Sequence, residues 1–556
     1  MHDNRLPKDR LITRWGALKS ERASWLSHWK EISEVTLPRN GRFFVQDRNR
    51  GMKRNRRIYD NTPTRALKVL AAGLMSGMTS PARPWFRLQT QDPDLNQNAN
   101  VKTWLDDCTK LLLQIFQRSN TYRALHSVYL ELGLFGTAAT IVVPDYENVI
   151  HHTPLTAGEY CIATDWKGNV STLFREFERT VHEIVNEFGI DNVSTTVRQQ
   201  FNGGSLDVWV PIVHCIEPRA DRDYGNPGNR NMPWRSVYFE LGGGNQNFLR
   251  ESGFKTFPAL CPRWDVIGGD IYGNGPGMDA LGDINQLQQE QLRKSQGIDF
   301  MTNPPLQVPS SMKNRDVETL PGGISYVDMN SPGSAIKSAF EVQLDLNHLL
   351  ADIQDVRERI NGAFYADLFL MLANDQNQRM TATEVAERHE EKMLMLGPVL
   401  ERLQNELLEP LIDFTFDQVM DNNLAPPPPQ ELEGQDLHVE LVSILAQAQK
   451  AIQTNAIDRF MGNVGALAQV KPEVLDNIDA DAWAHVYSDA LGIDPSLILP
   501  DEEVAKIRAQ RAQQQAAAQQ AAMAEQQANT AQTLSNTPTG GDTALAGIMG
   551  GLTGYG

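Results

Sequence analysis

Residues 280–299 read ALGDINQLQQEQLRKSQGID, a stretch whose residues favour a helix and whose few apolar side chains form a thin stripe. At 1.5 Å per residue this helix would be about 30 Å long. Residues 341–364 predict a second helix, because leucine, isoleucine and valine recur there every three or four positions. Residues 300–340 between them hold several prolines and short strand-like pieces. The sequence therefore predicts two helices that leave the body of the protein and return to it around a small non-helical unit.

The chain before this excursion begins with predicted helices. Thr62-Pro63 fits a helix start, because a proline in the first turn has no N–H that needs a partner. This helix would continue through RALKVLAAGLMSGM and end before Pro81. Further helices are expected over about residues 101–117 and 122–134.

From residue 137 to about residue 262 the pattern changes to that of a sheet. The runs ATIVVP, TLFREFE, LDVWVPIVHCI and SVYFEL are rich in β-forming residues and are separated by Gly, Asn, Asp and Pro. Polar and apolar residues alternate over Thr172–Glu178, which predicts a sheet with one face toward solvent.

The chain after the excursion opens with a polar break, ANDQNQRM at residues 373–380. The strongest helical periodicity in the chain follows, over residues 381–420. Pro398 and Pro410 interrupt this pattern, so we expect a bent helix instead of a straight one.

The last third of the chain changes composition twice. Residues 426–429 are consecutive prolines and predict a rigid linker to an acidic helical domain at 430–499. Residues 501–531 are rich in Ala and Gln and predict a helix with no wide apolar stripe, followed by a flexible tail at 532–556.

The composition excludes several classes of protein. The 556 residues are 41% hydrophobic and 22% charged, which is typical of a globular protein with several domains. No run approaches the roughly 18 apolar residues that span a bilayer, and the N-terminus has no apolar run of a secretory signal, so we expect synthesis in the cytoplasm and no membrane insertion. The net charge of −18 argues against a protein that grips nucleic acid over its whole surface, yet it permits one that lets DNA pass.

The motifs that carry chemistry are missing or incomplete. The four cysteines are too far apart for a zinc site, and His389-Glu390-Glu391 lacks a second histidine because Met393 stands in its place. The glycine-rich run IGGDIYGNGPGMDALG, residues 267–282, lacks the Lys and Ser/Thr of a phosphate loop, so we interpret it as a hinge between the body and the excursion. We therefore predict that the protein is not an enzyme and that it has no catalytic residue, no metal and no cofactor.

Residues 39–57 form a basic segment in this acidic chain. Such a run can contact DNA or an acidic partner. A solvated loop or a salt-bridge surface between subunits is the preferred interpretation, and the role of this segment stays open.

Taken in order, several segments resemble the portal, or head-to-tail connector, proteins of short-tailed bacteriophages (podoviruses). IYDNTPTRALKVLAAGLMSGMTSPARPWFRL at 58–88 resembles the N-terminal signature of the family. ELGLFGTAATIVV at 131–143 and YGNGPGMDALGDINQLQQ at 272–289 resemble its entries to the sheet and to the first stem helix. ALGIDPSLILPDEE at 490–503, followed by an Ala/Gln helix, also fits. The resemblance covers nearly the whole chain.

This resemblance implies an α+β, mostly α, portal-type subunit of a ring that usually has twelve copies. The implied parts are a wing at 1–279, stem helices at 280–299 and 341–364, a small α/β clip at 300–340, a channel loop and long kinked wing helix at 365–429, a helical crown at 430–500, a barrel helix at 501–531 and the flexible tail.

The implied function is a conduit for double-stranded DNA during packaging and ejection at one capsid vertex. The implied partners are further copies of the chain, non-specifically held double-stranded DNA, the large subunit of the packaging terminase, a tail adaptor, the major capsid and scaffolding proteins, and internal core or ejection proteins. The implied location is the portal vertex of the virion, after assembly in the host bacterial cytoplasm.

Candidate DNA-facing residues come from the polar break and from the first long helix. Gln376, Asn377 and Gln378 offer neutral hydrogen-bonding groups, and we hypothesise that Arg379 touches phosphate weakly and without sequence preference. Arg293 and Lys294 are the further candidates.

Two other functions stay open. A structural adaptor or scaffold of a virion could assemble through the helix at 381–420 without enclosing DNA, and it would form an open or elongated assembly. A nucleotide-dependent assembly factor would use the glycines at 268–282, and its ATP binding would depend on Gly275.

Overall fold

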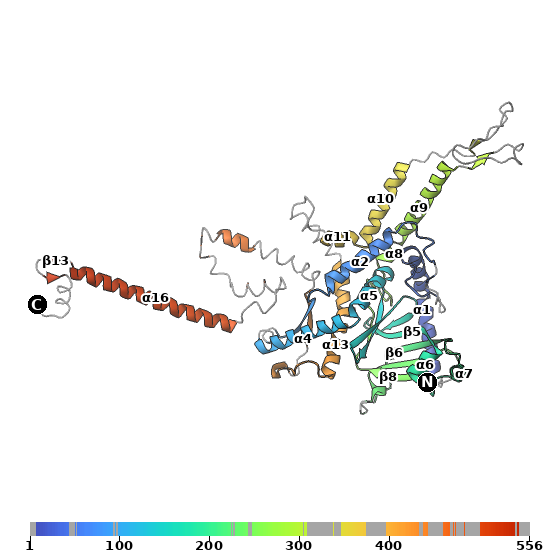
Figure 1. Cartoon of the computed structure of the whole chain (residues 1–556), viewed down its shortest axis with the longest axis horizontal. Helices are drawn as coiled ribbons and strands as arrows, with labels where there is room; N and C mark the ends of the chain where they lie inside the picture. The colour runs from blue at the N-terminus through green and yellow to red at the C-terminus, as the bar shows by residue number, and fades with distance from the viewer. Residues whose placement is uncertain are drawn as a thin grey trace. The chain divides into compact units, whose positions relative to one another are not determined.

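The computed structural model describes most of the chain, and Figure 1 shows its course. The described residues are 7–43, 51, 53–92, 95, 98–223, 225, 228–242, 247–303, 305–307, 337–338, 346–373, 396–432, 437–442, 460–467, 471, 473, 483, 487, 501–536, 538–539 and 542–543. The chain forms two compact units, one made of Met1–Gln91 with Trp104–Asn455 and the other of Asp92–Thr103 with Ala456–Gly556.

Among the elements that the structure describes, four helices precede the sheets, and three of them match the predicted ranges. They are α1 (Pro7–Thr36), α2 (Thr62–Met78), α4 (Ala99–Arg118) and α5 (Thr121–Phe135). Helix α2 carries its proline in the first turn and ends at Met78, as predicted. Helix α5 is capped by Gly136, whose backbone is left-handed (φ 70), a conformation that glycine adopts without steric cost.

Two antiparallel sheets follow, and they contain the four β-rich runs. The larger sheet has the order β4-β5-β6-β7-β8, formed by Tyr160–Thr164, Val170–Thr180, Trp209–Pro218, Trp234–Glu240 and Arg250–Phe254. The smaller has the order β3-β2-β9, formed by Val149–Leu155, Ala139–Asp145 and Ala259–Leu260. The predicted change from helices to strands after residue 136 is confirmed.

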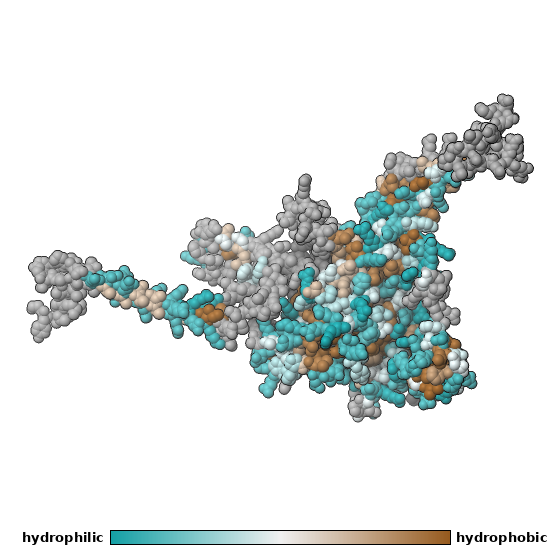
Figure 2. Space-filling model, viewed as in Figure 1, coloured by the Kyte–Doolittle hydropathy of each residue, from teal (hydrophilic) through white to brown (hydrophobic). Residues whose placement is uncertain are grey.

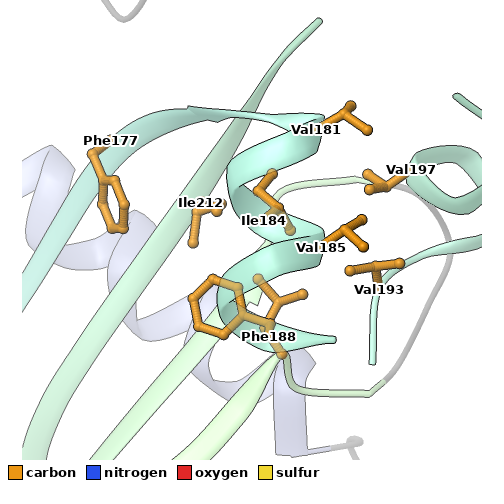
Figure 3. Close-up of a cluster of buried hydrophobic side chains, with 9 residues drawn as sticks. Phe177, Val181, Ile184, Val185, Phe188, Val193, Val197 and Ile212 are labelled. Atoms are coloured by element: carbon orange, nitrogen blue, oxygen red, sulfur yellow. The ribbon is translucent and has the colours of Figure 1, made fainter. Parts of the chain in front are cut away.

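Helices cover both faces of the larger sheet. Leu11 and Leu18 of α1 pack against Phe174 and its neighbours on one face. On the other face, α6 (Val181–Phe188) and α7 (Thr195–Asn202) enclose the cluster that includes Phe177 (Figure 3).

The prediction of a solvent-facing side for this sheet is therefore wrong. Arg175 and Glu176 produced the polar alternation of β5, but neither is exposed. Arg175 forms an ion pair with Glu159 at 3.1 Å, and Lys19 of α1 donates a hydrogen bond to Glu176 at 3.3 Å. Because charged partners on neighbouring elements pair with them, these polar side chains can lie partly buried.

The predicted excursion is present as two helices that lie side by side (Figure 1). They are α9 (Leu281–Thr302) and α10 (Leu346–Ala363), and α9 continues three residues past the predicted end at 299. Strands β10 (Leu306–Gln307) and β11 (Lys337–Ser338) pair beyond their far ends. Helix α11 (Ala366–Ala373) follows α10.

The long helix after α11 is described from residue 396 onward, so the first part of the predicted range lies outside the described residues. It is α-helical over 396–403, widens to a π-helix at Gln404–Leu408, and continues as α13 (Glu409–Asp421). Because Pro410 has no N–H to donate, an irregularity next to it is expected, whereas the described residues around Pro398, 396–403, are α-helical.

Residues 437–441 correct the prediction that the segment at 430–499 is helical. They form strand β12 (Leu437–Leu441), which pairs antiparallel with β1 (Phe86–Thr90). Because its partner strand β1 lies about 350 residues earlier in the chain, the local sequence gave no signal of this pairing.

In the second unit, helix α16 (Asp501–Asn536) extends past the predicted end at 531. Almost all its described side chains are exposed, and Figure 2 shows no continuous apolar stripe on the visible face. None of the described helices combines the length and apolarity needed to cross a bilayer.

Candidate functional site: the base of the paired helices

Asp60 joins the segment before α2 to both helices of the excursion. Its Oδ1 accepts hydrogen bonds from the backbone N–H and the hydroxyl of Thr62, at 2.8 and 2.6 Å. Its Oδ2 accepts from Gln291 of α9 at 3.0 Å and from the guanidinium of Arg357 of α10 at 2.7 and 3.1 Å. One carboxylate therefore holds three elements together.

The charge of Asp60 is stabilised despite its position. Burial alone would raise the pKa of this carboxyl group, but the hydrogen bonds from Thr62 and the nearby Arg357 outweigh burial and lower its pKa. The group is therefore ionised at neutral pH and pairs with Arg357 as a charge-assisted bond.

Gln288 of α9 closes the same junction from the backbone side. Its side-chain oxygen accepts from the backbone N–H groups of Tyr59 and Asp60 at 2.7 and 2.9 Å, and its side-chain nitrogen donates to the Asp60 carbonyl at 2.9 Å. Gln288 is buried, and these bonds satisfy its amide group. We call Asp60, Gln288, Gln291 and Arg357 the Asp60 junction.

The glycine-rich turn before α9 packs tightly against the end of α5. A Cβ at Gly275 would lie 2.6 Å from Cα of Gly136, and one at Gly277 would lie closer than 3.0 Å to the carbonyl oxygen of Leu134. Gly273 donates from its backbone N–H to the Thr137 hydroxyl at 2.7 Å. The glycines therefore allow backbones to touch, and the prediction of a hinge at this turn is not supported.

Arg263 fastens the long helix to the same region. Its guanidinium donates to Glu406 at 2.6 Å, and its backbone N–H donates to the same carboxylate at 2.9 Å. The guanidinium also donates to the carbonyl of Gly168 at 2.8 Å. Glu406 lies in the π-helical turn. This irregularity of the helix therefore places a carboxylate within hydrogen-bonding distance of the buried Arg263.

Charged residues continue along the facing sides of α9 and α10. Arg359 of α10 pairs with Asp283 of α9 at 3.6 Å and with Asp355 of its own helix at 3.6 Å. Farther along, burial and the neighbouring Asp352 raise the pKa of Glu290. The two helices are thus joined by polar contacts as well as by their apolar stripes.

The structure describes two of the six predicted DNA-facing residues. Arg293 is exposed on α9 and Lys294 beside it is half-buried, and neither has an ion pair or hydrogen bond among the described residues. Gln376, Asn377, Gln378 and Arg379 lie outside the described residues.

The Asp60 junction was not among the sites predicted from the sequence. Asp60 precedes Thr62-Pro63, and Gln288 is a polar residue next to the apolar stripe of α9, so both carried a weak signal. Their partners could not be inferred, because they lie more than 200 residues apart in the chain.

No catalytic or metal-binding arrangement is evident in the part of the chain that the structure describes. No cluster of three or more His, Cys, Asp or Glu side chains there could hold a metal ion. All four cysteines are buried free thiols, and burial raises the pKa of each of them. The charged groups of this region act as structural fasteners.

Comparisons with known proteins give a consistent assignment. A family model described as bacteriophage head to tail connecting protein matches residues 8–499. The probable portal protein of Bordetella phage BPP-1 is 62% identical over 545 residues, which cover 98% of each chain. The portal protein of Salmonella phage epsilon15 is 46% identical over 542 residues, which cover 97% of this chain and 98% of the relative.

Similar solved structures include the neck of the gene transfer agent (GTA) particle. The neck of the native particle matches with a TM-score of 0.35 at 12% identity, covering 75% of this chain and 90% of the other. The neck of the empty particle matches with a TM-score of 0.36 at 12% identity, covering 78% and 91%.

Proposed function

The chain belongs to the bacteriophage head-to-tail connecting protein family, and on that premise we propose that its copies close laterally into a ring through which double-stranded DNA passes. It is a portal-type connector of the phage particle, located at the capsid vertex where head and tail meet. Its role is structural, and no catalytic step forms part of it.

The observation that carries this function is the pair α9 and α10, fixed at its base by the Asp60 junction. A ring subunit that guides DNA needs elements whose position relative to the body does not drift. The charge-assisted bonds of Asp60 and the buried amide of Gln288 supply that rigidity. The glycine turn packed against Gly136 supports the same point.

The division into parts follows the same reasoning. We assign the wing to residues 1–279, the stem to α9 and α10, and the clip to the unit between them, residues 300–340. Strand β12 pairs with β1, so we begin the crown after residue 442 instead of at 430. Helix α16 is the proposed barrel helix.

The charge of the chain favours passage over capture. A chain with a net charge of −18 repels DNA wherever its carboxylates face the lumen, over roughly 8 Å in physiological salt. Between residues 512 and 536, α16 carries Glu525 as its single charged side chain, so a tube of these helices would hold few phosphates. Arg293 and Lys294, and Arg379 of the polar break, are the proposed weak phosphate contacts.

The far end of the α9–α10 pair is the proposed docking platform. Apolar side chains are exposed there (Figure 2). They are Ile298, Phe300, Met301, Leu306 and Leu350. Apolar side chains gathered in this way are typical of a protein interface, and the proposed occupants are the packaging terminase and then the tail adaptor.

The rival functions have less support. The nucleotide-dependent factor needs room for phosphate at Gly273, Gly275 and Gly277, and backbone atoms of Leu134 and Gly136 occupy that room. The adaptor without a channel remains the main alternative. Negative-stain electron microscopy of the purified chain separates the two: closed rings with an axial hole support the conduit, and open or solid assemblies contradict it.

A further inference from the structure

Helix α2 presents one exposed stripe on the side away from its buried apolar residues. Asn61, Arg65, Lys68 and Ala72 are all exposed, and they recur at intervals of four, three and four residues, which places them along one line. Together with partly buried residues of the same helix they line a hollow of about 350 Å³. We call Asn61, Arg65 and Lys68 the α2 basic face.

The two cations of this face have no counter-charge in the part of the chain that the structure describes. Neither Arg65 nor Lys68 forms an ion pair or a side-chain hydrogen bond with any residue that the structure describes. The arginines nearby differ: Arg57 pairs with Glu34 at 2.8 Å, Arg357 with Asp60, and Arg359 with Asp283. In a chain with a net charge of −18, two adjacent unpaired cations form a local site for an anion.

The helix that carries these cations is held on three sides. Helix α2 packs against α5, α10 and α11. Gly73 of α2 has no room for a Cβ, because the ring of Phe369 from α11 lies directly against it. The first turn of α2 is tied to α1, because the hydroxyl of Thr64 donates to the carbonyl of Thr36 at 2.5 Å. The backbone under Arg65 and Lys68 is therefore a fixed frame at the base of the α9–α10 pair.

We infer that the α2 basic face is a phosphate-contacting site for the DNA that the assembly conducts, an inference that rests on the proposed function. Residues three apart on a helix are neighbours, with Cβ atoms about 5–6 Å apart, so both long side chains can reach the phosphates of one strand. Contacts of this kind carry no sequence information and suit a duplex that must keep moving. Two such contacts per copy, without base contacts, give weak and salt-sensitive binding.

The test compares two double variants of the full chain, each of which removes two exposed cations. The first is Arg65→Gln/Lys68→Gln, and the matched control is Arg118→Gln/Arg123→Gln, which replaces two exposed arginines at the end of α4 and in α5. Electron microscopy records ring formation for wild type and both variants. Fluorescence anisotropy then measures binding of a mixed-sequence DNA duplex over a range of salt concentrations.

We expect intact rings for all three proteins. In the first variant the affinity for DNA should fall by about 8-fold at 0.1 M salt for each phosphate that is no longer neutralised, and the slope of log K against log salt should shrink by about 0.9 per phosphate. The control should change both quantities far less.

Two outcomes overturn the inference while leaving the proposed function intact. One is rings that bind DNA with wild-type affinity and slope after Arg65 and Lys68 are replaced. The other is loss of rings in the first variant alone, which would make this face a contact to carboxylates of the neighbouring copy. Failure of the wild-type chain to form rings would overturn the proposed function itself.

Discussion

Replacement of Asp60 by alanine tests whether one carboxylate fixes the α9–α10 pair to the body. The side chain of Asp60 is 5% exposed and that of Arg357 is 39% exposed, so the ion pair is partly screened by water. Breaking a fully buried pair costs about 3–5 kcal/mol. The Asp60→Ala change also removes the acceptor for Thr62 and Gln291, at about 1 kcal/mol for each bond. Discounting the ion pair for the exposure of Arg357, we expect a loss of about 2–4 kcal/mol.

The matched control is Asp283→Ala on the same pair of helices. Asp283 pairs with Arg359 at 3.6 Å, and the side chains are 32% and 47% exposed. Such a pair contributes about 0–1 kcal/mol, so its removal should change little.

The assay is thermal unfolding combined with amide hydrogen exchange, because a chain of two compact units need not unfold in one step. For Asp60→Ala we expect a lower first melting transition and faster exchange at the start of α2 and around Gln288 and Arg357. Equal effects of Asp60→Ala and Asp283→Ala on melting and exchange would refute the reasoning.

Three further predictions concern single positions. Burial raises the pKa of Glu131 to about 7, so the contribution of this group to stability is complete below its unfolded pKa of 4.5 and is lost as the pH rises through 7. Glu131→Gln should therefore make the melting temperature depend less on pH between pH 5 and pH 8, and an unchanged pH profile would contradict this. Arg263→Ala should destabilise the protein by about 3 kcal/mol in denaturant titrations, because it leaves a carboxylate without its buried partner, and a loss below about 1 kcal/mol would exclude a fastening role. Gly277→Ala should destabilise the protein by about 1–3 kcal/mol or more, since the new Cβ would meet a backbone carbonyl, whereas the control Gly282→Ala, at a position with open space around it, should stabilise it by about 0.5–1 kcal/mol. Equal melting temperatures of the two variants would show that the turn can shift to make room for a Cβ.

The sequence was informative wherever the determinants of structure are local. Proline at the start of α2, periodic leucines in α10 and β-branched runs in β2 and β6 each reflect one element's own chemistry, and these predictions are confirmed. The out-and-back excursion followed from the same signals, since two periodic stretches flank a proline-rich one.

Contacts between residues far apart in the chain could not be predicted from local sequence patterns. Strand β12 depends on the edge of β1, and the cover of the sheet that contains Arg175 depends on helices that come before and after it in the chain. The Asp60 junction requires three segments to meet, and no property of Asp60 by itself names Arg357 as its partner. The DNA-facing residues depend on contacts between subunits as well as within one chain. The position of Arg293 relative to the axis of the ring is set by how neighbouring copies pack.

A symmetry-averaged cryo-EM reconstruction of the purified full-length chain bears most directly on the ring. We expect identical subunits closed around an axial hole wide enough for a DNA duplex, with the α9–α10 pairs side by side around it and the Asp60 junction at the base of each pair. A reconstruction without a continuous hole, or with α9 and α10 pointing away from neighbouring subunits, would contradict the proposed conduit.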